Sequence, residues 1–224
     1  MVAGLRCVVC GEEIEISRPM SWTCPRATEA DPFHVLEFVD DGAPPTIEID
    51  RGESNPFVRY RERMGWWAFA RANGMSDDET VVLARSVAGQ FSVTPLQPHD
   101  GLSDVIGRSV WAKNETVGVS GSHKSRHLVG IMLHLIAAEQ LGMLTERPPL
   151  AISSCGNAAL AAATVASSQE WPLRVFVPTW MDDSFGSGLD ALGAEVNRCE
   201  RVAGAAGDPA MSAFREAVSQ GAIP

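Results

Sequence analysis

The stretch Leu150–Asn157, Leu-Ala-Ile-Ser-Ser-Cys-Gly-Asn, is a short apolar run that ends in a turn of small and polar residues. An alanine-rich stretch with helical character follows to about Ser168, and a second apolar run occupies Arg174–Pro178. Short apolar runs bounded by turn residues are typical of buried strands, and strands that alternate with helices indicate βαβ units. This stretch therefore predicts a parallel sheet.

The same alternation extends to both sides of the stretch. Further strands are expected at residues 109–113 and 195–197, and further helices at residues 125–141, 188–192 and 209–220. Right-handed crossovers place such helices on both faces of the sheet. The predicted fold class is α/β, with a parallel sheet covered on both faces.

The first part of the chain has a different character. Residues 1–45 are short and broken, and Asp40–Pro45 is typical of a linker. Residues 46–90 form a helical lead-in, with one helix expected over Asn55–Ala72 and another from about Asp77 to Val87. In the first of these, Trp66, Trp67 and Phe69 are interpreted as packing groups. We therefore divide the chain into residues 1–45, 46–90 and 91–224.

Three cysteines in the first part suggest half of a zinc ribbon. Cys7 and Cys10 have the Cys-x2-Cys spacing that lets two thiolates bind one tetrahedral ion, and Cys24 supplies a third thiol. A second pair would place its partner at position 27, which is Ala27. His34 could substitute, although its spacing is unusual. An eroded, ribbon-like segment is favoured, and a zinc ion bound by these residues is the alternative.

Composition restricts the classes of partner. The chain has 224 residues and a formal net charge of −10, which disfavours nucleic acid and anionic membranes as main partners. No stretch reaches the ~18 apolar residues of a membrane span, and the start lacks a basic segment followed by an apolar core. The five cysteines have no disulfide-like pattern. A cytoplasmic location is expected.

Lysine is nearly absent from this chain. The chain has two lysines, Lys113 and Lys124, and sixteen arginines. Lys124 lies in the stretch Gly121–Arg126, at the start of the helix expected at 125–141. A lysine amine condenses with an aldehyde, whereas an arginine guanidinium cannot replace it in that reaction. Lys124 is therefore a candidate for covalent cofactor binding, against the alternative of a chance position at a helix start.

Two loops lie where an open parallel sheet binds its ligands, at the carboxyl ends of strands. They are Gly121–Lys124 and Ser153–Asn157. Small residues let the backbone approach a ligand closely, and free amides at a helix start can hold an anion such as a carboxylate. The alternative for the second loop is ordinary helix capping by Ser and Asn.

The order of several short stretches resembles one known family. They are Thr94-Pro-Leu96, Trp111-Ala-Lys-Asn-Glu115, Ser122-His-Lys-Ser-Arg126, Ser154-Cys-Gly-Asn-Ala-Ala159, Val175-Phe-Val-Pro178 and Leu192-Gly-Ala-Glu-Val196. Together they resemble the fold-type-II pyridoxal-phosphate enzymes, which include threonine synthase, serine/threonine dehydratase, the tryptophan synthase β chain and cysteine synthase. The resemblance covers about residues 90–224.

The resemblance implies a role for each matched residue. Lys124 would form the internal aldimine, a Schiff base, with pyridoxal 5′-phosphate, and its freed amine would then act as general base. Ser122 and His123 would adjoin the cofactor, and Asn157 would hydrogen-bond its O3′ oxygen. The loop Ser154–Asn157, including Cys155 and Gly156, would hold the substrate α-carboxylate. His123 replaces the family's usual Phe or similar residue, and Cys155 stands where a Ser or Thr hydroxyl is common.

The implied activity is elimination or replacement at the β or γ carbon of a small amino acid, like that of threonine synthase or threonine/serine dehydratase. No stretch matches the family's glycine-rich phosphate loop or its pyridine-nitrogen partner. We therefore expect the front half of such an enzyme, as a truncated product, a frameshifted reading or one piece of a two-chain enzyme. A homodimer or a separate C-terminal half chain is the expected partner. The alternative is a non-catalytic half-domain.

Overall fold

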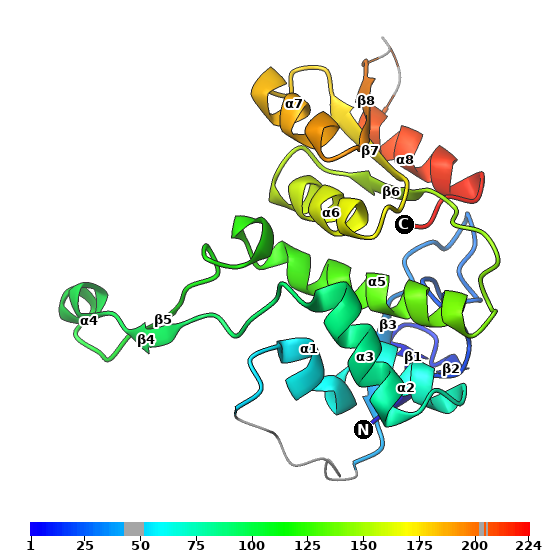
Figure 1. Cartoon of the computed structure of the whole chain (residues 1–224). Helices are drawn as coiled ribbons and strands as arrows, with labels where there is room; N and C mark the ends of the chain where they lie inside the picture. Colours follow the sequence, from blue (N-terminus) through cyan, green and yellow to red (C-terminus); the bar gives the residue numbers. More distant parts are fainter. Residues whose placement is uncertain (43–51, 202–203, 205) are drawn as a thin grey trace.

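The computed structural model describes residues 1–42, 52–201, 204 and 206–224 (Figure 1). The start of the expected linker, Asp40–Gly42, lies within the described residues. Its remainder, Ala43–Pro45, and the first residues of the lead-in, 46–51, lie outside them.

A three-stranded parallel sheet carries the expected α/β architecture. Its strands are β6 (Leu150–Ser153), β7 (Leu173–Pro178) and β8 (Glu195–Cys199), in the order β6-β7-β8. Helices α6 (Asn157–Ser168) and α7 (Asp183–Ala191) cover one face, and α8 (Pro209–Ser219) covers the other (Figure 1). The sequence-based prediction of a parallel sheet with helices on both faces is confirmed. A single parallel bridge joins Ile223 to the outer edge of β6 at Leu150.

Helix α5 (Lys124–Gln140) connects the α/β part to the rest of the molecule (Figure 1). It packs against α6 on one side and against two helices of the lead-in on the other. Leu133, Leu135 and Ala137 are fully buried within it because apolar residues occupy more than one of its faces. Its bounds agree with the helix expected at 125–141.

The lead-in is more broken than expected. Instead of one helix over 55–72, it contains α1 (Pro56–Arg59), a 3₁₀ turn η1 (Arg61–Arg63) and α2 (Gly65–Ala72), followed by α3 (Asp77–Ala88). The break has two local causes. The backbone of Met64 is extended, and Arg61 turns to donate hydrogen bonds to the carbonyl of Val58 and to Asp77 of α3. The packing role of the three aromatic residues is confirmed, since all are buried.

Two elements of the α/β part also differ from expectation. The strand expected at 109–113 is β5 (Trp111–Lys113), and it pairs antiparallel with β4 (Leu96–Pro98) instead of joining the parallel sheet. The β4–β5 ribbon and α4 (Asp100–Ile106) project from the body of the molecule (Figure 1). Helix α7 begins five residues earlier than expected because Asp182 accepts hydrogen bonds from the backbone amides of Ser184 and Phe185.

The first residues form a small antiparallel sheet. Its strands are β1 (Val2–Cys7), β2 (Glu13–Glu15) and β3 (Leu36–Asp40), in the order β2-β1-β3. The amide of Met20 donates to Nε2 of His134 on α5 at 3.0 Å, and the side chain of Asn73 donates to the carbonyl of Ser17 at 2.9 Å. These bonds attach the segment to the helices.

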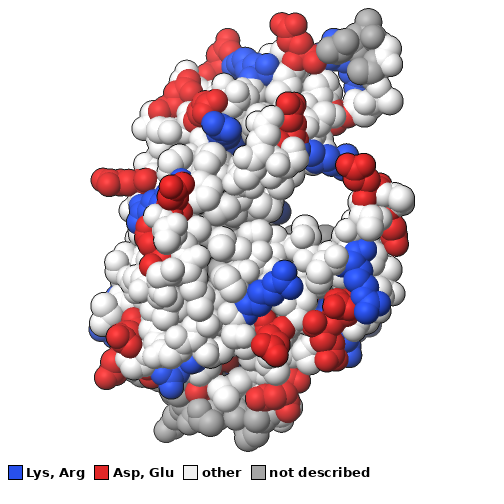
Figure 2. Space-filling model, turned by 90° about the vertical axis from the view of Figure 1, so that its right-hand side faces the viewer, with Lys and Arg blue, Asp and Glu red and all other residues white. Residues whose placement is uncertain are grey.

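Charged side chains of both signs are scattered over the face drawn in Figure 2, with no continuous basic area on that face. Within the described residues, no helix is both long enough and apolar enough to cross a lipid bilayer.

Candidate active site

Lys124 is the first residue of α5 and follows a sharply turned loop. The 3₁₀ turn η2 (Val119–Gly121) contains two successive residues in the left-handed region, Ser120 with φ 59° and Gly121 with φ 67°. A non-glycine residue in that region is uncommon and is held there by its surroundings. The buried hydroxyl of Ser125 donates to the carbonyl of Val119 at 2.8 Å and closes the turn. This local structure fixes where Lys124 begins the helix.

The two lysines of the chain have different environments. The ammonium group of Lys113 donates a hydrogen bond to the carbonyl of Thr94. Lys124 is half-buried, and its ammonium group has no hydrogen-bond or ion-pair partner within the described residues. Lys124 is thus the lysine with its amine uncommitted, whereas Lys113 supports the local structure.

Thr94, Glu115 and Arg126 form a polar network beside the start of α5. The hydroxyl of Thr94 donates to Glu115 at 2.7 Å, and Arg126 donates to the other carboxylate oxygen of Glu115 at 2.7 Å and to Thr94 at 3.0 Å. The Arg126 guanidinium holds the pKa of the Glu115 carboxyl below its usual range. The network joins three of the motif stretches, which lie far apart in sequence, around the turn that carries Lys124.

The second loop connects β6 to α6 and contains Ser154–Asn157. Gly156 precedes the first turn of α6, and no side chain caps that helix. Ser154 accepts a hydrogen bond from the amide of Gly156 at 3.4 Å, and Asn157 is exposed. Ordinary capping by Ser154 or Asn157 is therefore not what the structure shows. By contrast, Ser76 caps α3 and Asp208 caps α8.

Helix α5 also begins without a side-chain cap, at His123. The first amides of an uncapped helix lack intrahelical acceptors, and the helix dipole adds a partial positive charge there. Helix α6 packs against both α5 and η2, so the element that carries Asn157 adjoins the turn that precedes Lys124. The start of α6 thus has free amides for an anionic ligand, whereas at the start of α5 the amides of Lys124 and Arg126 already donate to Ser122 and His123.

The hydroxyl of Ser120 shows whether this turn has a polar group left for a ligand. Its hydroxyl is buried and has no hydrogen-bond partner among the described residues. Burying a hydroxyl without a partner costs about 1–3 kcal/mol. An unpaired buried donor in the turn before an uncommitted lysine fits a site for a polar, aldehyde-bearing cofactor.

Two cavities flank α5. One, of about 850 Å³, lies between the N-terminal sheet, α1 and α5, and is lined in part by Tyr60, Arg126 and His134. The other, of about 360 Å³, lies between α5, β6 and α8 and is mainly apolar. Neither is lined by Lys124 or Asn157, although the first is also lined by Glu115 of the polar network.

The comparison with family models decides the family. The model described as "Pyridoxal-phosphate dependent enzyme" matches residues 87–223. The chain belongs to this family. The cofactor of the family is pyridoxal 5′-phosphate, and the resemblance found in the motif stretches is confirmed.

One solved structure agrees at the level of the fold, and two others are similar at lower TM-scores. A pyridoxal 5′-phosphate-dependent aspartate racemase is 20% identical with a TM-score of 0.50, covering 63% of this chain and 42% of its own. Maize serine racemase is 16% identical with a TM-score of 0.47, covering 63% and 40%. A hydrogen sulfide-producing enzyme from Fusobacterium nucleatum is 19% identical with a TM-score of 0.46, covering 59% and 41%.

The chain spans about two fifths of the length of these solved structures. A search of the curated proteins gives no match. The family follows from the family model, and the fold from that model and the aspartate racemase, while the bond that is broken and the substrate do not.

The predicted site residues fall into two groups in the structure. Ser122, His123 and Lys124 share the turn before α5, and Ser154–Asn157 share the turn before α6. Their roles toward the cofactor and substrate stay predictions. The structure adds the Thr94–Glu115–Arg126 network and the Ser120 hydroxyl, neither of which sequence reasoning singled out. Thr94, Glu115 and Arg126 each lie in a quoted stretch, but only the fold shows that they meet.

His134 has a structural role on α5. Its side chain is half-buried. The ring lies 4.1 Å from the ring of Phe69 between centroids, and Nε2 accepts a hydrogen bond from the amide of Met20. Burial lowers the pKa of His134 to about 4. His134 is therefore neutral at physiological pH and serves as a packed hydrogen-bond acceptor.

Proposed function

We propose that this chain supplies the lysine-bearing part of a pyridoxal-phosphate enzyme that catalyses elimination or replacement at the β or γ carbon of a small amino acid. The observation that carries the proposal is the uncommitted amine of Lys124, at the start of α5 and within the family match. The resemblance to threonine synthase and threonine/serine dehydratase supports the reaction class.

The residues present fit the cofactor. When bound, pyridoxal 5′-phosphate supplies an electron sink for a bond at the substrate α-carbon. Lys124 would bind the cofactor covalently through Nζ and, once displaced by the substrate amine, would take and return a proton at the α-carbon. Asn157 would donate a hydrogen bond to the phenolic oxygen of the cofactor.

The backbone amides at the start of α6, together with Ser154 and Cys155, would hold the substrate carboxylate. A carboxylate fixed at that end leaves the substrate side chain free to take part in elimination or replacement. Nothing in these two loops selects one side chain over another, so a small amino acid is proposed as a class.

Further polypeptide is proposed to complete the catalytic unit, because the chain spans about two fifths of the solved structures it matches. A separate C-terminal half chain or a continuation of this one would supply the phosphate loop, and a homodimer is the proposed assembly. A cytoplasmic location is proposed as well, and it is supported by five free cysteines.

Covalent labelling tests the central assignment. The chain is mixed with pyridoxal 5′-phosphate, reduced with borohydride and digested, and the modified peptide is identified by mass spectrometry. We expect the label on Lys124, its loss in Lys124→Arg, and its retention in Lys113→Arg, which keeps the cationic partner of Thr94. A label on Lys113 alone would contradict the assignment. If no lysine of the chain alone is labelled, the labelling is repeated on the assembled enzyme, and no label there would favour the non-catalytic half-domain.

The reaction class is tested separately, on the assembled enzyme with L-serine or L-threonine. Elimination produces a 2-oxo acid and ammonia, whereas racemisation produces the D-amino acid and neither of those products. Release of a 2-oxo acid supports the proposal. Exclusive formation of the D-amino acid would overturn the reaction class and leave the role of Lys124 intact.

A further inference from the structure

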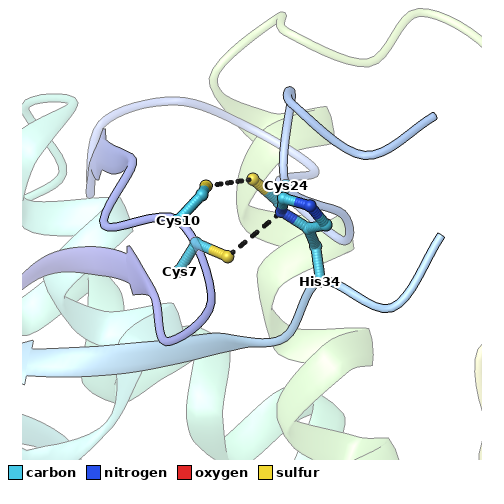
Figure 3. A group of neighbouring side chains, drawn as sticks. All are labelled: Cys7, Cys10, Cys24 and His34. Atoms are coloured by element: carbon cyan, nitrogen blue, oxygen red, sulfur yellow. Dashed lines mark hydrogen bonds between the residues drawn. The ribbon is translucent and has the colours of Figure 1, made fainter. Parts of the chain in front are cut away.

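The N-terminal segment gathers four metal-binding side chains at one point. Cys7 ends β1, Cys10 lies in the turn between β1 and β2, Cys24 lies in the loop that leads to β3, and His34 stands just before β3. One ligand atom from each lies within 4.8 Å of every other. Figure 3 shows the three sulfur atoms and the imidazole directed toward one another.

Two distances between these atoms match a tetrahedral site. Sγ of Cys10 lies 3.7 Å from Sγ of Cys24, and Sγ of Cys7 lies 3.4 Å from Nδ1 of His34 (Figure 3). Zinc bonds of about 2.3 Å to sulfur and about 2.0–2.1 Å to nitrogen place ligand atoms about 3.8 Å (S–S) and about 3.6 Å (S–N) apart around a tetrahedron. A disulfide requires sulfur atoms about 2 Å apart, which this separation does not provide.

The backbone around the cysteines is shaped as a metal knuckle. Gly11, with φ 73°, lets the chain turn back directly after Cys10, and its amide donates to the carbonyl of Cys7 at 2.9 Å. The amide of Arg26 points at Sγ of Cys24 at 3.4 Å. Amide donors of this kind stabilise thiolate ligands because they partly compensate their negative charge.

The orientation of His34 also suits metal binding. Its side chain is 4% exposed, and Nε2 lies 3.2 Å from a carboxylate oxygen of Asp31. A carboxylate that accepts the outer N–H of an imidazole fixes the ring and the tautomer, which leaves Nδ1 free to bind a metal. The missing fourth cysteine, at Ala27, is therefore replaced by a histidine seven residues further along the chain.

The segment has only a small core of its own. Among residues 1–42, only Cys7, Ile14 and Cys24 are buried, and two of these three are members of the cluster. A segment of about 40 residues with so small a core usually needs a disulfide or a metal to fold. A covalent cross-link is absent from the described residues, where all cysteines are free.

We propose that Cys7, Cys10, Cys24 and His34 bind one structural Zn²⁺ ion. Four protein ligands close the tetrahedron and leave no position for substrate, so the ion holds the β1–β3 sheet together and takes no part in the chemistry of Lys124. The ribbon is then intact, with histidine as its fourth ligand. This inference is independent of the proposed function.

Metal analysis of the full chain tests the proposal. Chain purified with zinc present should contain one zinc per chain, and thiol modification should release it to a chromophoric chelator. Cobalt reconstitution should give the visible bands of a tetrahedral site and thiolate-to-metal charge transfer. Zinc content far below one per chain, or a six-coordinate cobalt spectrum, would overturn it.

Variants identify the ligands. Cys24→Ser and His34→Gln should lose stoichiometric zinc, while Cys199→Ser, which removes a thiol outside the cluster, should retain it. If the ligand variants fail to fold, His34→Cys keeps the test decisive because four thiolates should still bind cobalt tetrahedrally, with a shifted charge-transfer band. Asp31→Asn should weaken zinc binding by about 10–100-fold. Zinc retained by His34→Gln and Cys24→Ser together would exclude the site.

Discussion

Glu115 links the parts of the chain that surround Lys124. Its carboxylate accepts one hydrogen bond from the hydroxyl of Thr94 and another from the guanidinium of Arg126 on α5. The side chains of Glu115 and Arg126 are 21% and 29% exposed. Partly buried, charge-assisted hydrogen bonds are stronger than surface ion pairs. The network therefore fixes the first turn of α5 relative to the loop that begins at Thr94.

At this scale we predict the effect of Glu115→Gln. Loss of the charge should destabilise the protein by about 1–2 kcal/mol and lower the fraction of Lys124 labelled after borohydride reduction. Thermal unfolding and quantitative peptide mapping measure the two effects. The matched control is Glu139→Gln, because Glu139 also pairs with an arginine, Arg147, at the other end of α5. Equal labelling in the two variants would show that the network does not position Lys124.

The Glu115 carboxyl also gives a pH dependence with a definite sign. Arg126 lowers its folded pKa below the ordinary value, so its contribution to stability is present above that ordinary pKa and is lost as the pH falls through the folded value. Wild-type protein should therefore lose more stability on acidification than Glu115→Gln does. If the free energy of unfolding fell equally with pH in the two proteins, the result would contradict this prediction.

Helix α5 links the candidate active site to the N-terminal segment. Its first turn carries Lys124, and three turns later His134 accepts the amide of Met20 and packs edge-on against Trp22, with ring centroids 5.4 Å apart. One rigid helix thus connects the candidate active site to the N-terminal segment. A half-buried neutral imidazole at the junction makes that connection sensitive to acid.

We predict this sensitivity from the pKa of His134, which burial lowers to about 4 from an ordinary value of 6.5. The unfolded chain binds a proton first as the pH falls, so stability due to His134 is complete above about pH 6.5 and is lost between there and pH 4, by up to about 3 kcal/mol. His134→Gln keeps an acceptor for Met20 but does not titrate. The difference in unfolding free energy between the two proteins should shrink across this window, and a constant difference would refute the prediction.

Local patterns in the sequence predict some elements well and others poorly. The bounds of α5 and α6 follow from apolar periodicity and composition, since both helices are defined by residues close in sequence. The break between α1 and α2 depends on Arg61 reaching Asp77, sixteen residues away, and the pairing of β5 depends on β4. Such contacts have no local signature. In the candidate metal site, His34 could be named from the sequence as a possible ligand, but its unusual spacing left its place beside Cys7 to be shown by the fold.

At the scale of the whole molecule, the N-terminal segment and the α/β part are stabilised differently. The core of the protein contains residues from α2, α3, α5, α6 and β7, whereas residues 1–42 contribute only partly buried side chains to it, such as Ile16 and Trp22. Hydrogen bonds at Met20 and Ser17 attach the segment to this core. The two parts should therefore respond differently to removal of a bound metal.

We predict that zinc removal loosens the first part selectively. Hydrogen exchange followed by mass spectrometry should show faster exchange in β1 (2–7) and β3 (36–40) after chelation, because their ladder then lacks its cross-link. Exchange in β7 (173–178) should change little, since Val175 and Val177 are fully buried in the main core. The Cys199→Ser protein should behave like the wild type. Equal acceleration in β1 and β7 would mean that the chain unfolds as one cooperative unit, whereas unchanged exchange in β1 would show that the sheet needs no metal.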